Sequence, residues 1–567
     1  MRRKIWTALL LAALLTVDCL GQKGRIKDKV KKELKEKSGF TDARLQRFDD
    51  LRNRLNEAAK RRFGVKRPDA HKTLPEEVKV VDTRHEISEA SGSFFEGDIL
   101  LSERQIDDFT RDASSRRKRA MIKDESYRWT MPIQFVVADS TLQTAFTDGV
   151  NRWKSLTCLQ FEQVSSATGD YIEVYDGTGC SSYVGKIDGK QTLSLSYPGC
   201  TGIRTVTHEL AHALGVWHEQ SRPDRDSYIK IIEENVQDGF LYNFLARDSA
   251  EVELYGTPYD FGSVMHYGPQ SFQASEDVNT IEALDPRFQD TMGQQIGPSF
   301  YDVKIINSAY CSDVCSGSSL ACQHNGYADP KDCSVCRCPD GFGGQLCDQA
   351  ASTGSSCGQI DLQATTDWQT LTNTGDSDCN WFIVAADGSS NIEFYLESFS
   401  FPGDSYVCDS IYLELKVFQD LANTGARICN DVALNSVSTS EGSEMMVIYK
   451  GSSGSSFALK YRISPGDGGW SPWGPWSPCT AECGACGTHT KTRTCLSEPC
   501  EGKSSKTRPC KRRVCRGEGP ECCEPFQRKK GKCVRKRRKD GHHSGHGQHH
   551  HHRSSEHHSW SHGEDEE

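Results

Sequence analysis

Residues 208–219 read HELAHALGVWHE, and the chemistry expected of the chain begins with this stretch. His208 and His212 are four residues apart, so a helix presents both imidazoles on one face, as a zinc ion requires. Gly215 can adopt a positive φ, which lets the helix end there and the chain turn back. That turn would deliver His218 as a third ligand. The stretch therefore predicts a site for one Zn²⁺ held by His208, His212 and His218.

Glu209 lies beside these ligands rather than among them. A carboxylate there can take a proton from the attacking water, whose pKa zinc lowers to roughly 7, and pass it to the leaving amine. Downstream, residues 263–267 read SVMHY, which fits the methionine turn of the metzincins. A histidine pair alone is often solvent-facing or core, but the added Gly215, His218 and this turn favour a metal site.

The extended motif, with Glu219 after the third histidine, and the SVMHY turn resemble the astacin family of secreted zinc endopeptidases. The resemblance implies an α+β fold with a two-subdomain metzincin catalytic domain and one zinc ion. It implies that Tyr267 is a mobile extra ligand that hydrogen-bonds the oxyanion, and that Met265 forms the hydrophobic floor under the metal. The family's disulfides would pair Cys158 with Cys311 and Cys180 with Cys200.

Length and cysteine content point to a secreted multidomain protein. The chain has 567 residues and 25 cysteines, too many for a reducing compartment. A basic start at Arg2–Lys4 and an apolar run over Ile5–Val17 predict a signal peptide over 1–21. Cys19 would leave with it, which makes the remaining count even. No later stretch suggests a membrane anchor, and no nucleic-acid partner is expected. The net charge of -10 is spread between basic and acidic segments, so it indicates little about partners.

Residues 22–119 are predicted to form a propeptide. Its first half is rich in charge with apolar residues at helical spacing, which suggests exposed helices with modest apolar faces and no core of their own. Residues 116–119 read RRKR, a site of the proprotein convertase type, and cleavage after Arg119 would leave Ala120 as the new N-terminus. A solvated charge run is the alternative interpretation of these four residues.

The resemblance to astacins assigns two further roles in activation. The freed amine of Ala120 would be buried near Glu219. Residues 95–98 read FEGD, which resembles the family's FxGD switch. Asp98 would then occupy the position on zinc that the attacking water needs.

The catalytic domain is expected over residues 120–311, with substrate extended along a sheet edge in the cleft. Hydrophobic periodicity predicts strands over 132–138, 171–175 and 192–197 and helices over 142–153 and 201–214. Tolloid-type astacins favour acidic residues after the scissile bond through arginines beyond the methionine turn. Residues 292–297 read MGQQIG, so this preference is in doubt here.

Two cysteine-containing modules are expected next. Residues 312–348 resemble an EGF-like domain held by its bridges, with Cys338 paired to Cys347; a zinc knuckle at Cys333 and Cys336 is the weaker alternative. The pairing of Cys315, Cys322, Cys333 and Cys336 stays open. Residues 357–464 alternate in short runs and resemble a CUB β-sandwich. Its expected disulfides are Cys357–Cys379 and Cys408–Cys429.

The CUB resemblance does not extend to a calcium site. In CUB domains that bind calcium, an Asp commonly follows the third cysteine by three residues, whereas Asp409 here follows Cys408 directly. Recognition or positioning is the expected role of this domain.

Residues 467–516 closely resemble a thrombospondin type 1 repeat. Trp470, Trp473 and Trp476 would stack with guanidinium groups, of which Arg493 is the clearest candidate. The expected pairs are Cys479–Cys510, Cys483–Cys515 and Cys495–Cys500. Four further cysteines have no assigned partner but suggest an added local pairing: Cys486, Cys522, Cys523 and Cys533.

Residues 517–567 are expected to be a disordered basic and histidine-rich tail. Its basic block and the thrombospondin repeat suggest binding to sulfated glycans or matrix.

The sequence as a whole predicts a secreted astacin-type zinc endopeptidase, made as a zymogen. The module order resembles nematode astacins that act on cuticle collagen and in moulting, so a cuticle matrix protein is the expected substrate. The alternative is a catalytically silent matrix adhesion or scaffold protein that retains the protease fold. That alternative requires a broken metal set, whereas the ligands, Glu209 and Tyr267 are all present.

Overall fold

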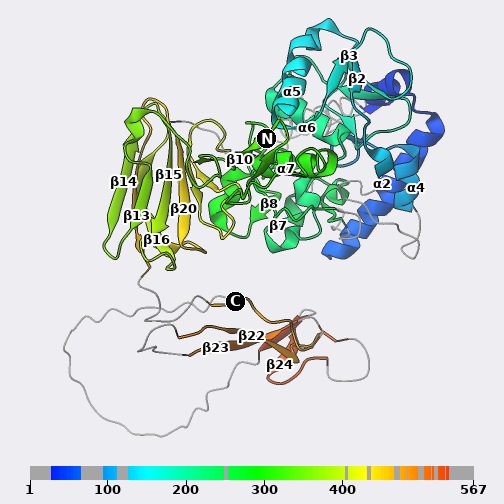
Figure 1. Cartoon of the computed structure of the whole chain (residues 1–567). Coiled ribbons are helices and arrows are strands. Elements are labelled where there is room, and N and C mark those ends of the chain that lie inside the picture. Colours follow the sequence, from blue (N-terminus) through cyan, green and yellow to red (C-terminus); the bar gives the residue numbers. More distant parts are fainter. Residues whose placement is uncertain are drawn as a thin grey trace, which may run out of the picture. The chain divides into compact units, whose positions relative to one another are not determined.

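A computed structural model describes the chain in two compact units, residues 1–464 and 465–567, which are treated separately below (Figure 1). The described ranges are 27–64, 94–110, 125–247, 253–402, 407–430, 436–464, 473–481, 483–495, 503–511, 514–515, 521–529 and 532–535. The predicted signal peptide, the predicted cleavage site at Arg119 and Ala120, and the histidine-rich segment lie outside these ranges. Among the described residues, no helix combines the length and apolarity needed to cross a bilayer.

The first half of the catalytic domain is a four-stranded parallel sheet packed against two helices. Its strand order is β3-β2-β4-β6, with β3 Phe161–Gln163, β2 Ile133–Val137, β4 Tyr171–Tyr175 and β6 Lys190–Ser194. The helices are α5 Gln143–Leu156 and α6 Ile203–Ala213. Gly149 lets them approach closely, since a Cβ there would lie 2.4 Å from Val206 Cγ1. The predicted strands and helices are present within a few residues, and short β3 was not predicted.

The second half has little regular structure and is held by aromatic packing. A two-stranded antiparallel sheet joins β7 Ile229–Ile231 to β8 Ile281–Ala283. Helix α7, Phe300–Tyr310, begins with a capping box in which Ser299 and Asp302 bond each other's backbone amides. Around the β7–β8 sheet packs a cluster that includes Phe244, Tyr259, Phe261, Phe272 and Phe288. Helix α7 instead buries Val303 and Ile306 in the core of the first half.

Short 3-10 helices, labelled η, connect these elements. They are η1 Glu125–Tyr127, η2 Ser140–Leu142, η3 Glu219–Ser221, η4 Arg225–Ser227, η5 Glu233–Asn235, η6 Leu241–Phe244, η7 Pro286–Thr291 and η8 Ser355–Cys357.

Two disulfides lie in the catalytic domain, Cys158–Cys311 and Cys180–Cys200. The first closes a loop of 153 residues and joins the end of α7 to the segment that follows α5. On a chain-entropy estimate, a loop of this length is worth about 5 kcal/mol. It therefore holds the end of α7 against the first half of the domain.

The described parts of the predicted propeptide are largely helical, and their apolar faces are covered. Residues 27–38 and α2, Asp42–Phe63, form two helices, and β1 Ile99–Leu100 and α4 Glu103–Thr110 follow. The apolar faces of the first two are buried and contribute to clusters that include Tyr183 and Tyr242 of the catalytic domain. The expectation of exposed helices was wrong because the amphipathic pattern does not reveal which surface covers the apolar face.

Residues 312–348 form a small module with strands β9 Tyr327–Asp329, β10 Asp332–Arg337 and β11 Phe342–Gly343, the last paired with β12 Gln349–Ala350. Three disulfides stabilise it: Cys315–Cys333, Cys322–Cys336 and Cys338–Cys347. All six cysteines are consumed, so the zinc-knuckle alternative is wrong.

Residues 357–464 form a sandwich of two sheets, here named the CUB-like sandwich. One sheet has the order β13-β15-β20-β17-β18, with β13 Asp361–Ala364, β15 Asp378–Ala385, β20 Glu444–Lys450, β17 Tyr412–Lys416 and β18 Ala426–Ile428. The other has the order β14-β21-β16-β19, with β14 Gln369–Thr374, β21 Ser456–Ile463, β16 Ile392–Ser400 and β19 Ser438–Thr439. Its disulfides are Cys357–Cys379 and Cys408–Cys429.

The second unit is a ladder of stacked side chains. Strands β22 Gly487–Thr492 and β23 Ser505–Cys510 pair, with disulfides Cys479–Cys510 and Cys483–Cys515. The Arg493 guanidinium lies 4.6 Å from the Trp473 ring centre, and Arg508 lies 4.4 Å from that of Trp476. Trp470 and Cys500 lie outside the described residues.

The expectation of a disordered tail from residue 517 was wrong over part of its length. Strands β24 Phe526–Lys529 and β25 Lys532–Arg535 form a hairpin. Disulfides Cys486–Cys523 and Cys522–Cys533 fasten it to the repeat. These disulfides stabilise the hairpin at residues 526–535. From its basic composition alone, this segment would be expected to stay solvated and unfolded.

Candidate metal and catalytic centre

Helix α6 carries two of the predicted ligands, His208 and His212. Every residue of this helix from Val206 to Ala213 is buried. Gly215 has φ +107°, and its amide donates to the His212 carbonyl at 2.8 Å. This left-handed turn ends the helix and redirects the chain, so that His218 returns to face α6.

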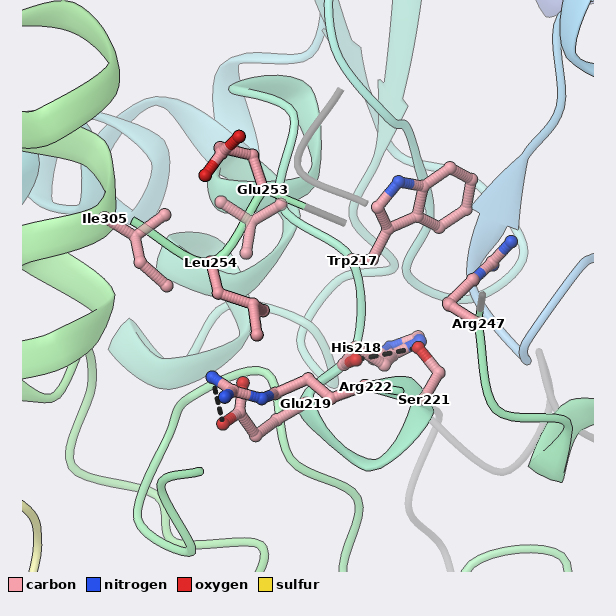
Figure 2. A pocket seen from close by; sticks show the side chains of 10 residues that line it. Trp217, His218, Glu219, Ser221, Arg222, Arg247, Glu253, Leu254 and Ile305 are labelled. Carbon is pink, nitrogen blue, oxygen red and sulfur yellow. Dashed lines mark hydrogen bonds and ion pairs between the residues drawn. The ribbon is translucent and has the colours of Figure 1, made fainter. Parts of the chain in front are cut away.

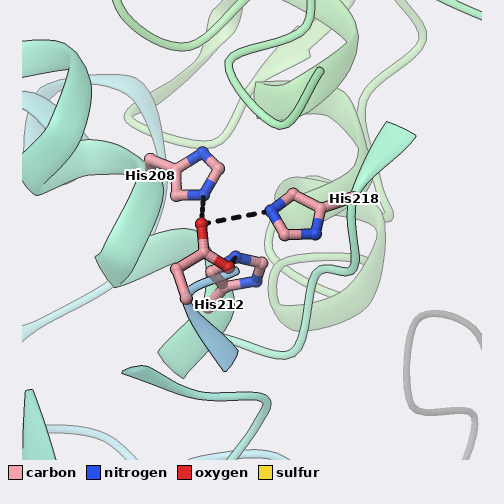
Figure 3. A group of neighbouring side chains, drawn as sticks. His208, His212 and His218 are labelled. Atoms are coloured by element: carbon pink, nitrogen blue, oxygen red, sulfur yellow. Dashed lines mark hydrogen bonds and ion pairs between the residues drawn. The ribbon is translucent and has the colours of Figure 1, made fainter. Parts of the chain in front are cut away.

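The three imidazoles converge on one point (Figure 3). Each is also oriented by a hydrogen bond at its far nitrogen. His208 Nδ1 donates to the Val264 carbonyl at 2.8 Å, and His212 Nδ1 donates to the Val216 carbonyl at 2.7 Å. A carbonyl only accepts, so both rings carry their proton on Nδ1 and leave the Nε2 lone pair for a metal.

The carboxylate of Asp98 lies between the three Nε2 atoms. The distances are 3.1 Å to His208, 3.5 Å to His212 and 3.3 Å to His218. Burial opposes ionisation of Asp98, but the surrounding imidazoles hold its pKa well below the ordinary value. The propeptide thus places an anion at the point to which the three lone pairs are directed.

This donor set fits a zinc ion. The ligand atoms of Asp98 and the three histidines lie within 4.8 Å of one another, and all four residues are buried. Three imidazole nitrogens with one carboxylate oxygen are ligands that tetrahedral zinc accepts.

Glu209 is completely buried next to the histidines, and neither of its carboxylate oxygens has a hydrogen-bond partner among the described residues. Burial, and then the negative charge of Asp98, raise its pKa well above the ordinary value. An unpaired buried carboxylate is costly in a purely structural role and suits a group that exchanges protons.

Tyr267 and Met265 lie on the other side of the site. The Tyr267 ring is 4.7 Å from that of His218, and its hydroxyl donates to the Glu96 carbonyl at 2.6 Å. Met265 is buried in the core of the first half of the catalytic domain, and its carbonyl accepts a hydrogen bond from the Glu219 amide at 3.0 Å.

Sequence reasoning missed a second anchor in the propeptide. Glu96 Oε2 lies 2.9 Å from His218 Nδ1, and its Oε1 accepts from Arg247 at 2.6 Å. The Glu96 amide donates to the Asn243 side chain at 3.1 Å. Glu96 belongs to the FEGD stretch, which the sequence analysis singled out. No motif around Arg247 indicates that it pairs with Glu96.

Glu219 is buried beside a pocket that Trp217, Arg222, Leu254 and Ile305 also line (Figure 2). Its Oε1 accepts from the Asp260 amide at 2.8 Å and lies 3.4 Å from Arg222 Nη1. Burial outweighs these contacts and raises the pKa of Glu219 to about 8. A further cation in this pocket would favour the charged form.

Comparison with known proteins agrees with this geometry. The family model Astacin (Peptidase family M12A) matches residues 121–311, and the Thrombospondin type 1 domain matches residues 471–515. Zinc metalloproteinase nas-34 of Caenorhabditis elegans is 37% identical over 452 residues, 76% of this chain and 73% of that protein. Zinc metalloproteinase nas-36 of the same organism is 32% identical over 522 residues, 84% of each.

A solved structure is also similar, that of High choriolytic enzyme 1, a hatching enzyme zinc-protease from Oryzias latipes. It is 32% identical, with 33% of this chain and 96% of that chain covered and a TM-score of 0.31. The length and identity of the nas-34 and nas-36 matches confirm the fold class and the enzyme class predicted from the sequence. The chain belongs to the astacin family of zinc metalloendopeptidases.

Proposed function

We propose that this chain is secreted as a zymogen and, once its propeptide is removed, hydrolyses internal peptide bonds of extracellular matrix proteins, cuticle collagen first among them. The observation that carries the zymogen proposal is the Asp98 carboxylate seated between the Nε2 atoms of the three histidines. A substrate cannot reach that point while the propeptide occupies it.

The proposed mechanism assigns His208, His212 and His218 as zinc ligands. When bound there, zinc would lower the pKa of the attacking water and polarise the scissile carbonyl. Glu209 takes a proton from the water as its oxygen bonds to the carbonyl carbon. Glu209 then gives the proton to the leaving amine as the C–N bond breaks. Its complete burial beside the histidines supports this role.

Tyr267 is proposed to donate its hydroxyl hydrogen to the developing oxyanion. In the proprotein this hydroxyl already donates to a carbonyl, that of Glu96. Removal of the propeptide would free the donor next to His218, where charge develops in the transition state.

The propeptide is held on both sides of the active site, which supports its role as the inhibitor. Strand β1 pairs in parallel with β5, Ser182–Tyr183, so that Ile99 lies opposite Ser182. Glu96 pairs with Arg247, and the Arg247 guanidinium lies 3.8 Å from the Trp217 ring centre. Asp98 therefore sits in a segment that is fixed at either end.

Activation is proposed to follow convertase cleavage after Arg119. The new amine of Ala120 would enter the pocket beside Glu219, where a buried carboxylate with a raised pKa gains most from a positive partner. Glu219 lies directly after His218, so this ion pair would fix the third ligand.

Binding to sulfated glycans is proposed for the thrombospondin-type repeat. Lys491, Arg493 and Arg508 all lie near its tryptophan rings, and Arg508 and Lys506 alternate with Thr507 along β23. A row of cations on a strand suits a polyanion. This would hold the enzyme close to matrix substrates.

Replacement of Glu209 by Gln is expected to lower kcat/KM by at least about a hundredfold, because the amide cannot accept and return a proton. A quenched fluorescent peptide measures the rate on the activated enzyme, and metal analysis should still find one zinc per chain. Full turnover in the Glu209→Gln protein would remove Glu209 from the mechanism.

Latency can be tested in a proprotein whose RRKR site at residues 116–119 is changed to alanines. Asp98→Ala in that background should raise peptide hydrolysis about tenfold, since loss of one charged contact is worth about 1.5 kcal/mol or more. Glu96→Ala leaves Asp98 in place and should raise it less. An uncut Asp98→Ala protein as silent as its parent would contradict the proposal.

Glu219→Gln is expected to lower kcat/KM of the cleaved enzyme about tenfold, because the neutral amide forms no ion pair with the Ala120 amine. N-terminal sequencing should give Ala120 for both proteins. Glu282→Gln, at an exposed ion pair with Lys230, is the matched control and should leave the rate unchanged. Equal rates for the Glu219 variant and the parent would contradict the proposed ion pair between Glu219 and the Ala120 amine.

The substrate class can be tested on cuticle matrix from Caenorhabditis elegans, the organism of the two relatives. Active enzyme should create new N-termini within cuticle collagens, identified by terminal labelling and mass spectrometry, that Glu209→Gln enzyme does not create. New termini confined to non-collagen proteins would rule out collagen and make those proteins the substrates. The absence of new termini would refute a matrix substrate.

A further inference from the structure

The CUB-like sandwich contacts the catalytic domain at the segment that carries the methionine turn. We name residues 257–267 the Met-turn strap and residues 422–427 the sandwich loop. Nearby, the Phe418 ring stacks on Phe288 with centres 4.9 Å apart, and the Arg427 amide donates to Thr291 Oγ1 at 3.0 Å. These contacts bury the loop between the two domains.

Two residues of the sandwich loop touch the strap itself. Asn423 is 5% exposed, and its Nδ2 donates to the Tyr259 carbonyl at 2.8 Å. Thr424 packs directly on Gly262, because a Cβ added at Gly262 would lie 2.4 Å from Thr424 Cγ2 and 2.6 Å from Thr424 Cβ. The φ of Gly262 is not in the left-handed region, so the close approach, and not the backbone conformation, requires glycine.

The residues that the loop touches also hold the catalytic centre. Tyr259 Oη lies 2.6 Å from His266 Nε2, and His266 Nδ1 donates to the Tyr267 carbonyl at 2.7 Å. The Nε2 atom must therefore accept the Tyr259 proton. The Asp260 amide, one residue on, donates to Glu219. The strap thus connects the sandwich loop to Tyr267 and Glu219.

We infer that the sandwich loop is a positioning element of the active site, in which Asn423 and Thr424 fix the Met-turn strap and, through it, Tyr267 and Glu219. The CUB-like sandwich then completes the catalytic domain in addition to any role in targeting. The inference rests on the peptidase class of the chain and is independent of the proposed activation and substrate.

The test uses a compensating pair in the full chain. Gly262→Ala forces the strap and loop apart, and Thr424→Gly removes the three atoms that would lie nearest to the new methyl. In the uncleaved proprotein, Gly262→Ala should speed amide hydrogen exchange over residues 257–267 about tenfold and leave exchange in β2 and β4 unchanged. The double variant should regain most, but not all, of the parent's protection, because the packing conflict is gone and Asn423 still holds Tyr259 while the Thr424 contact with the strap is lost.

Activity gives the second readout. After cleavage, Gly262→Ala should lower kcat about tenfold with little change in KM, and the double variant should restore it, because positioning acts on the reacting geometry. Gly442→Ala in the sandwich meets only Gln419 atoms at 3.6 Å or more and serves as the control. A double variant as impaired as Gly262→Ala, or a Gly262→Ala protein identical to the parent, would overturn the inference.

Asn423→Ala covers the case in which Gly262→Ala does not fold. It removes one hydrogen bond without a clash and should speed exchange at Asp260 and its neighbours about threefold, with a matching fall in kcat. Unchanged exchange and kcat in Asn423→Ala would overturn the inference on their own.

Discussion

The orientation of the three imidazoles is the constraint on which the centre depends. Two of them donate Nδ1 hydrogens to backbone carbonyls, of Val264 in the Met-turn strap and of Val216 in the turn after α6. The metal-facing lone pairs are therefore set by the backbone of two segments outside the zinc helix. Any movement of these two segments would therefore rotate an imidazole ring and turn its lone pair away from the metal position.

The segment proposed as the propeptide meets these same imidazoles with acidic side chains. Asp98 takes the position to which the lone pairs point, while Glu96 takes the outer nitrogen of His218 and accepts the Tyr267 hydroxyl at its carbonyl. Two acidic residues, two positions apart, thus engage the inner and outer faces of one histidine. Residues 96–98 thus engage His218 at both ring nitrogens and also occupy the Tyr267 hydroxyl.

The sequence was sufficient for everything that depends on local spacing. The zinc helix was predicted over 201–214 and runs from Ile203 to Ala213, because the motif and Gly215 specify both its face and its end. The Trp473–Arg493 stack was expected from the resemblance to a thrombospondin type 1 repeat. In both cases a recognisable motif names the residues that interact.

What the sequence could not supply are contacts between distant segments. Arg247 and Glu96 are 151 residues apart, and neither has a local pattern that names the other. The contact between Thr424 and Gly262 depends on how two domains pack against each other. A glycine before SVMHY does not by itself indicate that another domain lies against it. The hairpin at residues 526–535 was hidden by its basic composition, since its order comes from cross-links whose pairing no spacing rule determines.

The burial of the propeptide on both halves of the catalytic domain bears on the kinetics of its departure. Strand β1 lies on the sheet half, and Tyr242 of the other half shares a cluster with Phe48 and Leu51 of α2. A cut anywhere between Thr110 and Glu125 leaves all of these contacts intact. Under the proposed activation, scission would therefore convert a tethered segment into a separate bound polypeptide, and full turnover would wait for its dissociation, its dilution or its further digestion.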